Sequence, residues 1–207
     1  MTTTTNYSHD YYLRNIYSSN RFARKSENRP TMLPNDLVKA DSSALIKITE
    51  QLRNLEYSSD NGMDVLNHAK LFIETYNNLY ESSTASDSDQ IGRFHKELKY
   101  LTKEEKDNLE SIGITISASG KLNLDKEKFA ESNPSKIEEV LGKDSTFLNK
   151  LSTVARKMKR TAHRTAPAPT VKKSSSDTDN TTVSAPDTMS NTVSAGIVSA
   201  TKVDVVL

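Results

Sequence analysis

Apolar residues recur at steps of three and four along the middle of the chain. Each run follows a polar residue suited to a helix start, and turns rich in Ser, Asn, Asp and Gly separate the runs. The three runs are Leu45, Ile48, Leu52 and Leu55; Val65, Ala69, Phe72, Tyr76 and Leu79; and Ile91, Phe94, Leu98 and Leu101. Because this spacing places apolar side chains in one stripe along a helix, it predicts three consecutive helices.

A fourth stripe lies at about 145–161, where Leu148, Leu151, Ala155 and Met158 repeat the spacing. The predicted fold class is therefore mainly α, a helical bundle or a coiled-coil-like stalk. The candidate packing residues are Leu45, Ile48, Leu52, Phe72, Tyr76, Leu79, Phe94, Leu98, Leu148 and Leu151. Such stripes are more often an internal core than a partner surface, but the narrow first and third stripes also favour packing between molecules. Both alternatives stay open.

One passage alternates apolar and polar residues instead. The segments 112–116 and 121–124 flank a turn that ends at Gly120, which predicts a small β-hairpin at about 112–124. Its motif residues are Gly113, Gly120, Leu122, Leu124 and Asp125. Thr102 and Glu105 have the spacing of a capping box that opens a short helix before the hairpin. After the hairpin, Asp125 and the Asn133-Pro134 pair predict two further helix starts.

Both ends of the chain lack this periodicity. Residues 1–35 are rich in Thr, Ser, Asn and Tyr, and residues 161–207 are rich in Ser, Thr, Pro and Ala. Apolar residues make up 34% of the chain and aromatic residues 6%, which is low enough that part of it is expected to bury nothing. We therefore expect a helical domain at 36–160 between two disordered segments.

The sequence offers no set of residues that predicts catalysis, a cofactor or a metal. Cysteine is absent, which excludes disulfides and thiolate chemistry, and the four histidines are far apart. The segment from Asp87 to Leu98 begins like a calcium loop, but Ile91 and Leu98 supply no side-chain oxygen at two ligand positions. We expect neither a cleavable secretory signal nor a membrane span, since no apolar run is long enough for either. The chain is thus expected to be a protein-binding molecule rather than an enzyme.

The strongest charge signal is basic. Between Lys150 and Lys173 there are eight Lys or Arg residues and no Asp or Glu. The centre of this basic segment is Arg156, Lys157, Lys159 and Arg160. It can hold an acidic protein or nucleic-acid phosphates, although cations near a helix C-terminus are also favoured by the helix dipole. With a net charge of +1 and no aromatic residue in the segment, nucleic acid is the less favoured partner, and the helix-end explanation is preferred.

The order of these elements resembles the C-terminal region of the bacterial flagellar filament-cap protein family, also called hook-associated protein 2. The resemblance covers about residues 62–158. It is carried by the helix with Phe72, Tyr76, Asn77 and Leu79, the Ile112-Gly113-Ile114 strand, the Gly120–Asp125 return, Phe129, Asn133-Pro134 and Val140-Leu141. The chain departs from the family in lacking its large β-rich head and its long terminal helices.

The resemblance implies a headless, truncated relative of the helical stalk, which packs through heptad helices with itself or with flagellar axial subunits. It also implies export through the flagellar type III route, which reads a disordered N-terminus, and a place outside the cell or in the flagellum. The alternative is a cytoplasmic helical adaptor or regulator that binds an acidic protein or nucleic acid through the basic segment.

Overall fold

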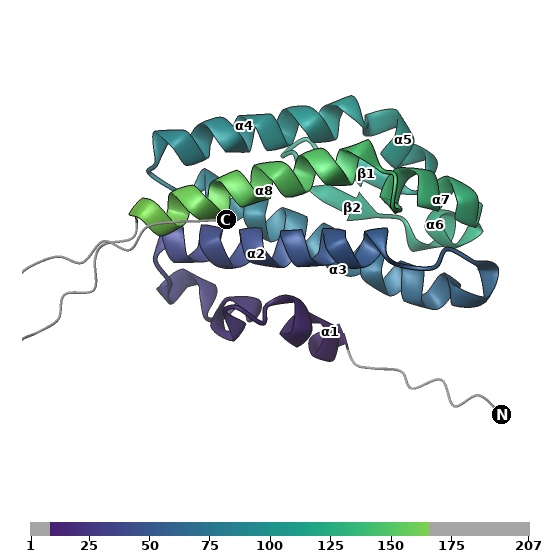
Figure 1. Cartoon of the computed structure of the whole chain (residues 1–207), viewed down its shortest axis with the longest axis horizontal. Coiled ribbons are helices and arrows are strands. Elements are labelled where there is room, and N and C mark those ends of the chain that lie inside the picture. The colour runs from purple at the N-terminus through teal and green to yellow at the C-terminus, as the bar shows by residue number, and fades with distance from the viewer. Residues whose placement is uncertain (1–8, 166–207) are drawn as a thin grey trace, which may run out of the picture. The chain divides into compact units, whose positions relative to one another are not determined.

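The computed structural model describes residues 9–165, which form a mainly helical domain with one small antiparallel sheet (Figure 1). The helices are α1 (His9–Ile16), α2 (Pro34–Arg53), α3 (Gly62–Thr84), α4 (Asp89–Glu104), α5 (Lys106–Ser111), α6 (Lys126–Glu131), α7 (Pro134–Leu141) and α8 (Thr146–Thr165). Strand β1 (Ile114–Ile116) pairs with β2 (Leu122–Leu124) so that Thr115 lies opposite Asn123. The predicted fold class is confirmed.

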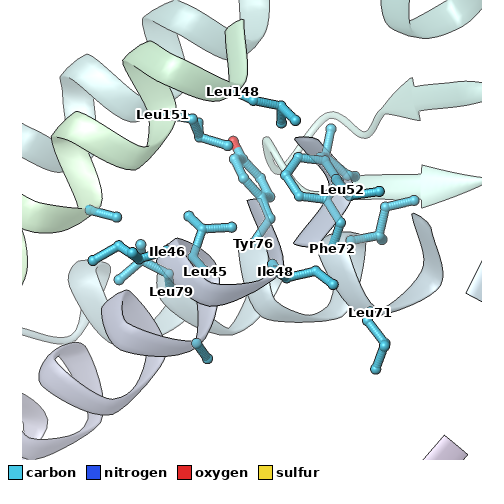
Figure 2. Close-up of a cluster of buried hydrophobic side chains, with 14 of the residues drawn as sticks. Leu45, Ile46, Ile48, Leu52, Leu71, Phe72, Tyr76, Leu79, Leu148 and Leu151 are labelled. Atoms are coloured by element: carbon cyan, nitrogen blue, oxygen red, sulfur yellow. The ribbon is translucent and has the colours of Figure 1, made fainter. Parts of the chain in front are cut away.

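Helices α2, α3 and α8 build the core. Helix α2 packs against both α3 and α8, and α4 covers the other side of α8. Figure 2 shows side chains from α2, α3 and α8 converging on one apolar cluster around Phe72 and Tyr76. Burial of apolar side chains is the main source of stability in such a bundle, so these three helices position everything else.

The predicted packing residues belong to this core. All of them are fully buried except Phe94, which is partly exposed. Their surface is already covered by the same chain and is not available to a second molecule. The interpretation of these stripes as an interface between molecules is therefore wrong for the buried residues, and any partner must bind elsewhere.

The N-terminal segment is ordered from His9 onward, contrary to the prediction for residues 1–35. Two short 3₁₀ helices, η1 (Arg21–Arg24) and η2 (Arg29–Thr31), follow α1. Leu13, Ile16, Tyr17 and Ala23 are buried against the domain. These few apolar residues form no sustained period, which is why the pattern predicted disorder. Residues 1–8 lie outside the described part of the chain.

A buried polar network fastens this segment to α2 and α3. The guanidinium of Arg29 donates to both carboxylate oxygens of Asp41 at 2.9 and 2.8 Å, and the Tyr17 hydroxyl donates to Asp41 Oδ1 at 3.0 Å. Asn78 Nδ2 donates to the Tyr17 hydroxyl oxygen at 2.8 Å. Burial and the Asp41 carboxylate raise the pKa of Tyr17, so the hydroxyl keeps its proton and remains a donor. Asp41 is the polar residue before the first apolar run and suits a helix start, but it lies within α2 as the hub of this network.

Two other local predictions fail, and two are confirmed. Thr102 is buried in the last turn of α4, and its hydroxyl lies 3.0 Å from both the Tyr76 hydroxyl and the Leu98 carbonyl oxygen, so it caps nothing. Helix α8 continues to Thr165, which moves the start of the predicted tail, and residues 166–207 lie outside the described part. Asp125 and Asn133 accept from backbone amides and cap α6 and α7 as predicted.

Candidate functional site

A basic groove lies between α2 and the C-terminal half of α8, with a volume of about 440 Å³. Lys39 and Ile46 line it from α2. Arg156, Lys159, Arg160, His163 and Arg164 line it from α8. The two helices run antiparallel, as the contact from Arg53 at the end of α2 to the Lys143 carbonyl before α8 indicates. Five positive side chains from two helices therefore face one hollow.

Most of these cations lack a carboxylate partner within the described part of the chain. Arg156 Nη2 lies 2.6 Å from Glu50 Oε1, and both side chains are about half exposed. Lys39, Lys159, Arg160 and Arg164 form no salt bridge with any described residue. The groove is thus a concentration of uncompensated positive charge on a molecule whose net charge is only +1.

The structure divides the predicted basic segment between two faces of α8. Arg156, Lys159 and Arg160 line the groove, but Lys157 points toward α4. Its Nζ lies 3.0 Å from Glu97 Oε1 and 5.7 Å from the centroid of the Phe94 ring. Lys157 therefore links two helices and does not belong to the site.

Lys39 and Ile46 were missed by the sequence reasoning. Their positions on α2 carry no local signal, since they become part of a site only when α2 packs on α8. Arg164 belongs to the basic run but not to the four residues at its predicted centre. Its place in the helical repeat, four residues after Arg160, would have grouped it with Arg156 and Arg160 on one helix face.

A second feature of the domain is the joint between the β-hairpin and α3. The Asn77 side chain pairs with the backbone of Leu122: its Nδ2 donates to the Leu122 oxygen at 2.9 Å, and its Oδ1 accepts from the Leu122 amide at 2.8 Å. Gly113 and Gly120 both have positive φ, at 80° and 89°. Leu122 is buried, whereas Leu124 is partly exposed and packs against the core from β2. This arrangement is structural and contains no reactive group.

Gly120→Ala is expected to destabilise the domain by about 1–3 kcal/mol, because a side chain there strains a positive-φ backbone. Its Cβ would also collide with the Tyr80 hydroxyl. Gly92→Ala in α4 is the matched control, since nothing lies within 4 Å of the new methyl group. Helix propensity predicts that Gly92→Ala stabilises by roughly 0.5–1 kcal/mol. Urea titrations of both variants measure the difference, and equal effects would contradict the assigned role of Gly120.

One polar cluster outside the groove pairs a serine with a histidine. Ser83 Oγ lies 2.9 Å from His95 Nδ1, but Ser83 is buried and its hydroxyl also donates to the Tyr80 carbonyl at 3.0 Å. Burial and the nearby Lys99 lower the pKa of His95. No group of three or more His, Cys, Asp or Glu residues within 9–165 is arranged to hold a metal ion. No helix in that range is long and apolar enough to cross a membrane.

The basic groove is the feature of this domain with the clearest chemical preference. It offers charge and shape for an anion, whereas the α3–hairpin joint is fully used in holding the fold together. Comparison with family models, curated proteins and solved structures finds no match to this chain.

Proposed function

We propose that this chain is a non-enzymatic structural protein of the flagellar axial type, which acts by binding other proteins. The observation that supports the proposal is contact between the separate pieces of the filament-cap resemblance. The Asn77 side chain, from the helix piece, forms two hydrogen bonds with the backbone of Leu122, from the hairpin piece. Gly120 lies directly against Tyr80, one turn further along α3.

These contacts explain why the pieces occur in this order and with this spacing. Gly113 lies so close to the start of α6 that an added Cβ would be 2.9 Å from both the Asp125 oxygen and the Phe129 nitrogen. Asp125 in turn caps α6 by accepting from the Lys128 amide at 3.0 Å. The helix, hairpin and following short helix therefore form one interlocked unit, and this contact supports the proposal that they resemble the family as a unit.

Binding to other axial subunits would use outward-facing residues, because the heptad stripes are buried. The domain exposes several large apolar side chains that could contact a neighbour. They are Tyr11, Phe22, Leu33, Met63 and Tyr100. Under this proposal the chain acts outside the cell or in the flagellum, after export through the flagellar type III route.

The proposal is tested by release of the full chain from flagellated bacteria. Type III export passes unfolded chains, so the docked residues from His9 to Thr31 must leave the domain before export. We expect the chain in the culture medium only when the export gate works, and we expect deletion of residues 1–34 to abolish release. A cytoplasmic protein of the same host serves as the lysis control. Equal absence of the chain from the media of cells with and without the gate would overturn the proposal.

A second candidate function is a cytoplasmic adaptor, and the basic groove favours it. Arg156, Lys159 and Arg160 face one hollow together with Lys39 from α2. A protein retained in the cell that loses a partner when these charges are reversed would fit the adaptor. Gate-dependent release combined with unchanged partner binding in the charge-reversed variant would exclude it.

A further inference from the structure

We infer that the basic groove between α2 and α8 binds a short acidic segment of another protein, with an apolar side chain seated on Ile46. The inference requires only that the groove is a binding site, whichever of the two functions the chain performs. Its test uses purified protein and no export step, so it can fail while the flagellar proposal stands, and the reverse also holds.

The charge of the groove points to an anion. Lys39, Lys159, Arg160 and Arg164 lack described carboxylate partners, and no Asp or Glu lines the groove. Like charges held close together repel each other, and a bound anion relieves that repulsion. An anionic ligand is therefore stabilised here more than at an isolated surface cation.

The helix dipole does not account for this arrangement. It favours cations within the last turn of a helix, which covers His163 and Arg164. Arg156 lies more than two turns before the end of α8, at Thr165. Lys39 lies in the N-terminal half of α2, where the dipole does not favour a positive charge. The dipole therefore explains neither residue: Arg156 pairs with Glu50, and Lys39 has no carboxylate partner among the described residues.

The ligand chemistry favours carboxylates over nucleic acid. None of the lining residues is Phe, Tyr or Trp, so the His163 imidazole is the one ring in the groove on which a base could stack. Ile46 and the aliphatic stems of Lys and Arg instead offer an apolar floor for one small side chain. Glu50 already places a carboxylate oxygen 2.6 Å from Arg156 at one edge of the groove, which is the contact that an acidic partner would repeat along α8.

The length of the groove fits a short peptide. The helix rise of ~1.5 Å per residue separates Arg156 and Arg164 by roughly 12 Å. An extended chain covers that distance in about four residues at ~3.3 Å each. We therefore expect the bound segment to have acidic residues at both ends of a tetrapeptide-sized core, with an apolar residue between them.

The experiment measures binding of a fluorescent peptide of repeating Asp, Leu and Glu to the full chain by anisotropy at low salt. The control probes are the uncharged Asn, Leu and Gln equivalent and a thymidine oligonucleotide of equal charge. We expect the acidic peptide to bind more tightly than both. We also expect its affinity to fall at least tenfold in the double variant Lys159→Glu with Arg160→Glu, and to fall further as salt is added.

Matched variants keep the test specific. Lys150→Glu with Lys103→Glu makes the same change in net charge at exposed residues that do not line the groove, on α8 and α4. This control double variant should bind the acidic peptide with a Kd within about twofold of that of the unaltered chain, a difference of ~0.4 kcal/mol in binding free energy. Thermal melts confirm that every variant folds. Equal loss in both double variants, or tighter binding of the oligonucleotide than of the peptide, would overturn the inference.

Discussion

Phe72→Ala is expected to reduce the free energy of unfolding by about 3–5 kcal/mol, the usual cost of deleting a buried aromatic ring. The Phe72 side chain is 0% exposed at the centre of the α2–α3–α8 cluster (Figure 2). Its ring meets Phe147 edge-on, with centroids 6.3 Å apart, and lies 6.4 Å from the ring of Tyr76. The substitution leaves a cavity that three packed helices cannot close without losing other contacts. Urea denaturation followed by circular dichroism measures the loss.

Phe22→Ala is the matched control, because it makes the same chemical change at a ring that is 53% exposed. We expect it to cost less than about 1 kcal/mol, as surface substitutions usually do. If Phe72→Ala is equally mild and only weakens self-association, then the stripe on α3 is an interface rather than a core. That result would restore the interpretation that the present packing rejects.

Asp41→Asn is the second substitution with a large expected effect, about 3–5 kcal/mol, because it leaves the Arg29 guanidinium in a buried site without its counter-charge. Asp41 is 0% exposed and accepts three hydrogen bonds from Arg29 and Tyr17. Burial disfavours the charged guanidinium, but the Asp41 carboxylate outweighs it, and the pKa of Arg29 is raised above its usual value. The neutral amide removes this compensation, so we expect residues 9–33 to detach first. Hydrogen exchange of their amides, together with urea denaturation, measures both effects.

Asp10→Asn provides the control for this pair. Asp10 also pairs with an arginine, Arg24, but its side chain is 62% exposed. The Arg24 side chain is only 11% exposed, but the Asp10 carboxylate reaches water, and ion pairs screened by water and salt contribute ~0–1 kcal/mol. Similar losses for Asp41→Asn and Asp10→Asn would show that burial of the Arg29–Asp41 pair does not anchor the N-terminal segment.

Helix starts and stripes were predictable where the signal is local. Ser88 accepts from the Ile91 amide at the start of α4, and Asp125 caps α6, because a cap needs only a neighbouring residue. Thr102 had the right neighbours for a cap but lies in the last turn of α4. Its hydroxyl is engaged by Tyr76, 26 residues away, and no local pattern contains that contact.

The candidate site was predictable only in part, for the same reason. Arg156, Lys159 and Arg160 stand out as a run of charge, so sequence reasoning found them. Lys157 belongs to the same run, but it lies on the face of α8 that packs on α4, where it contacts Glu97 and Phe94. Which members of a charged run act together depends on the helices that pack beside it.

The sequence by itself determined the mainly helical class, the hairpin near 112–124 and the capped starts of α6 and α7, because periodicity, turn residues and caps act over a few residues. Only the tertiary structure decided that the stripes close into one core and that residues 9–33 dock through Asp41. It also decided that Lys39 and Arg164, from two helices far apart in the sequence, share one groove. These features depend on contacts between distant segments, whose free energy is gained only when α2, α3 and α8 pack together.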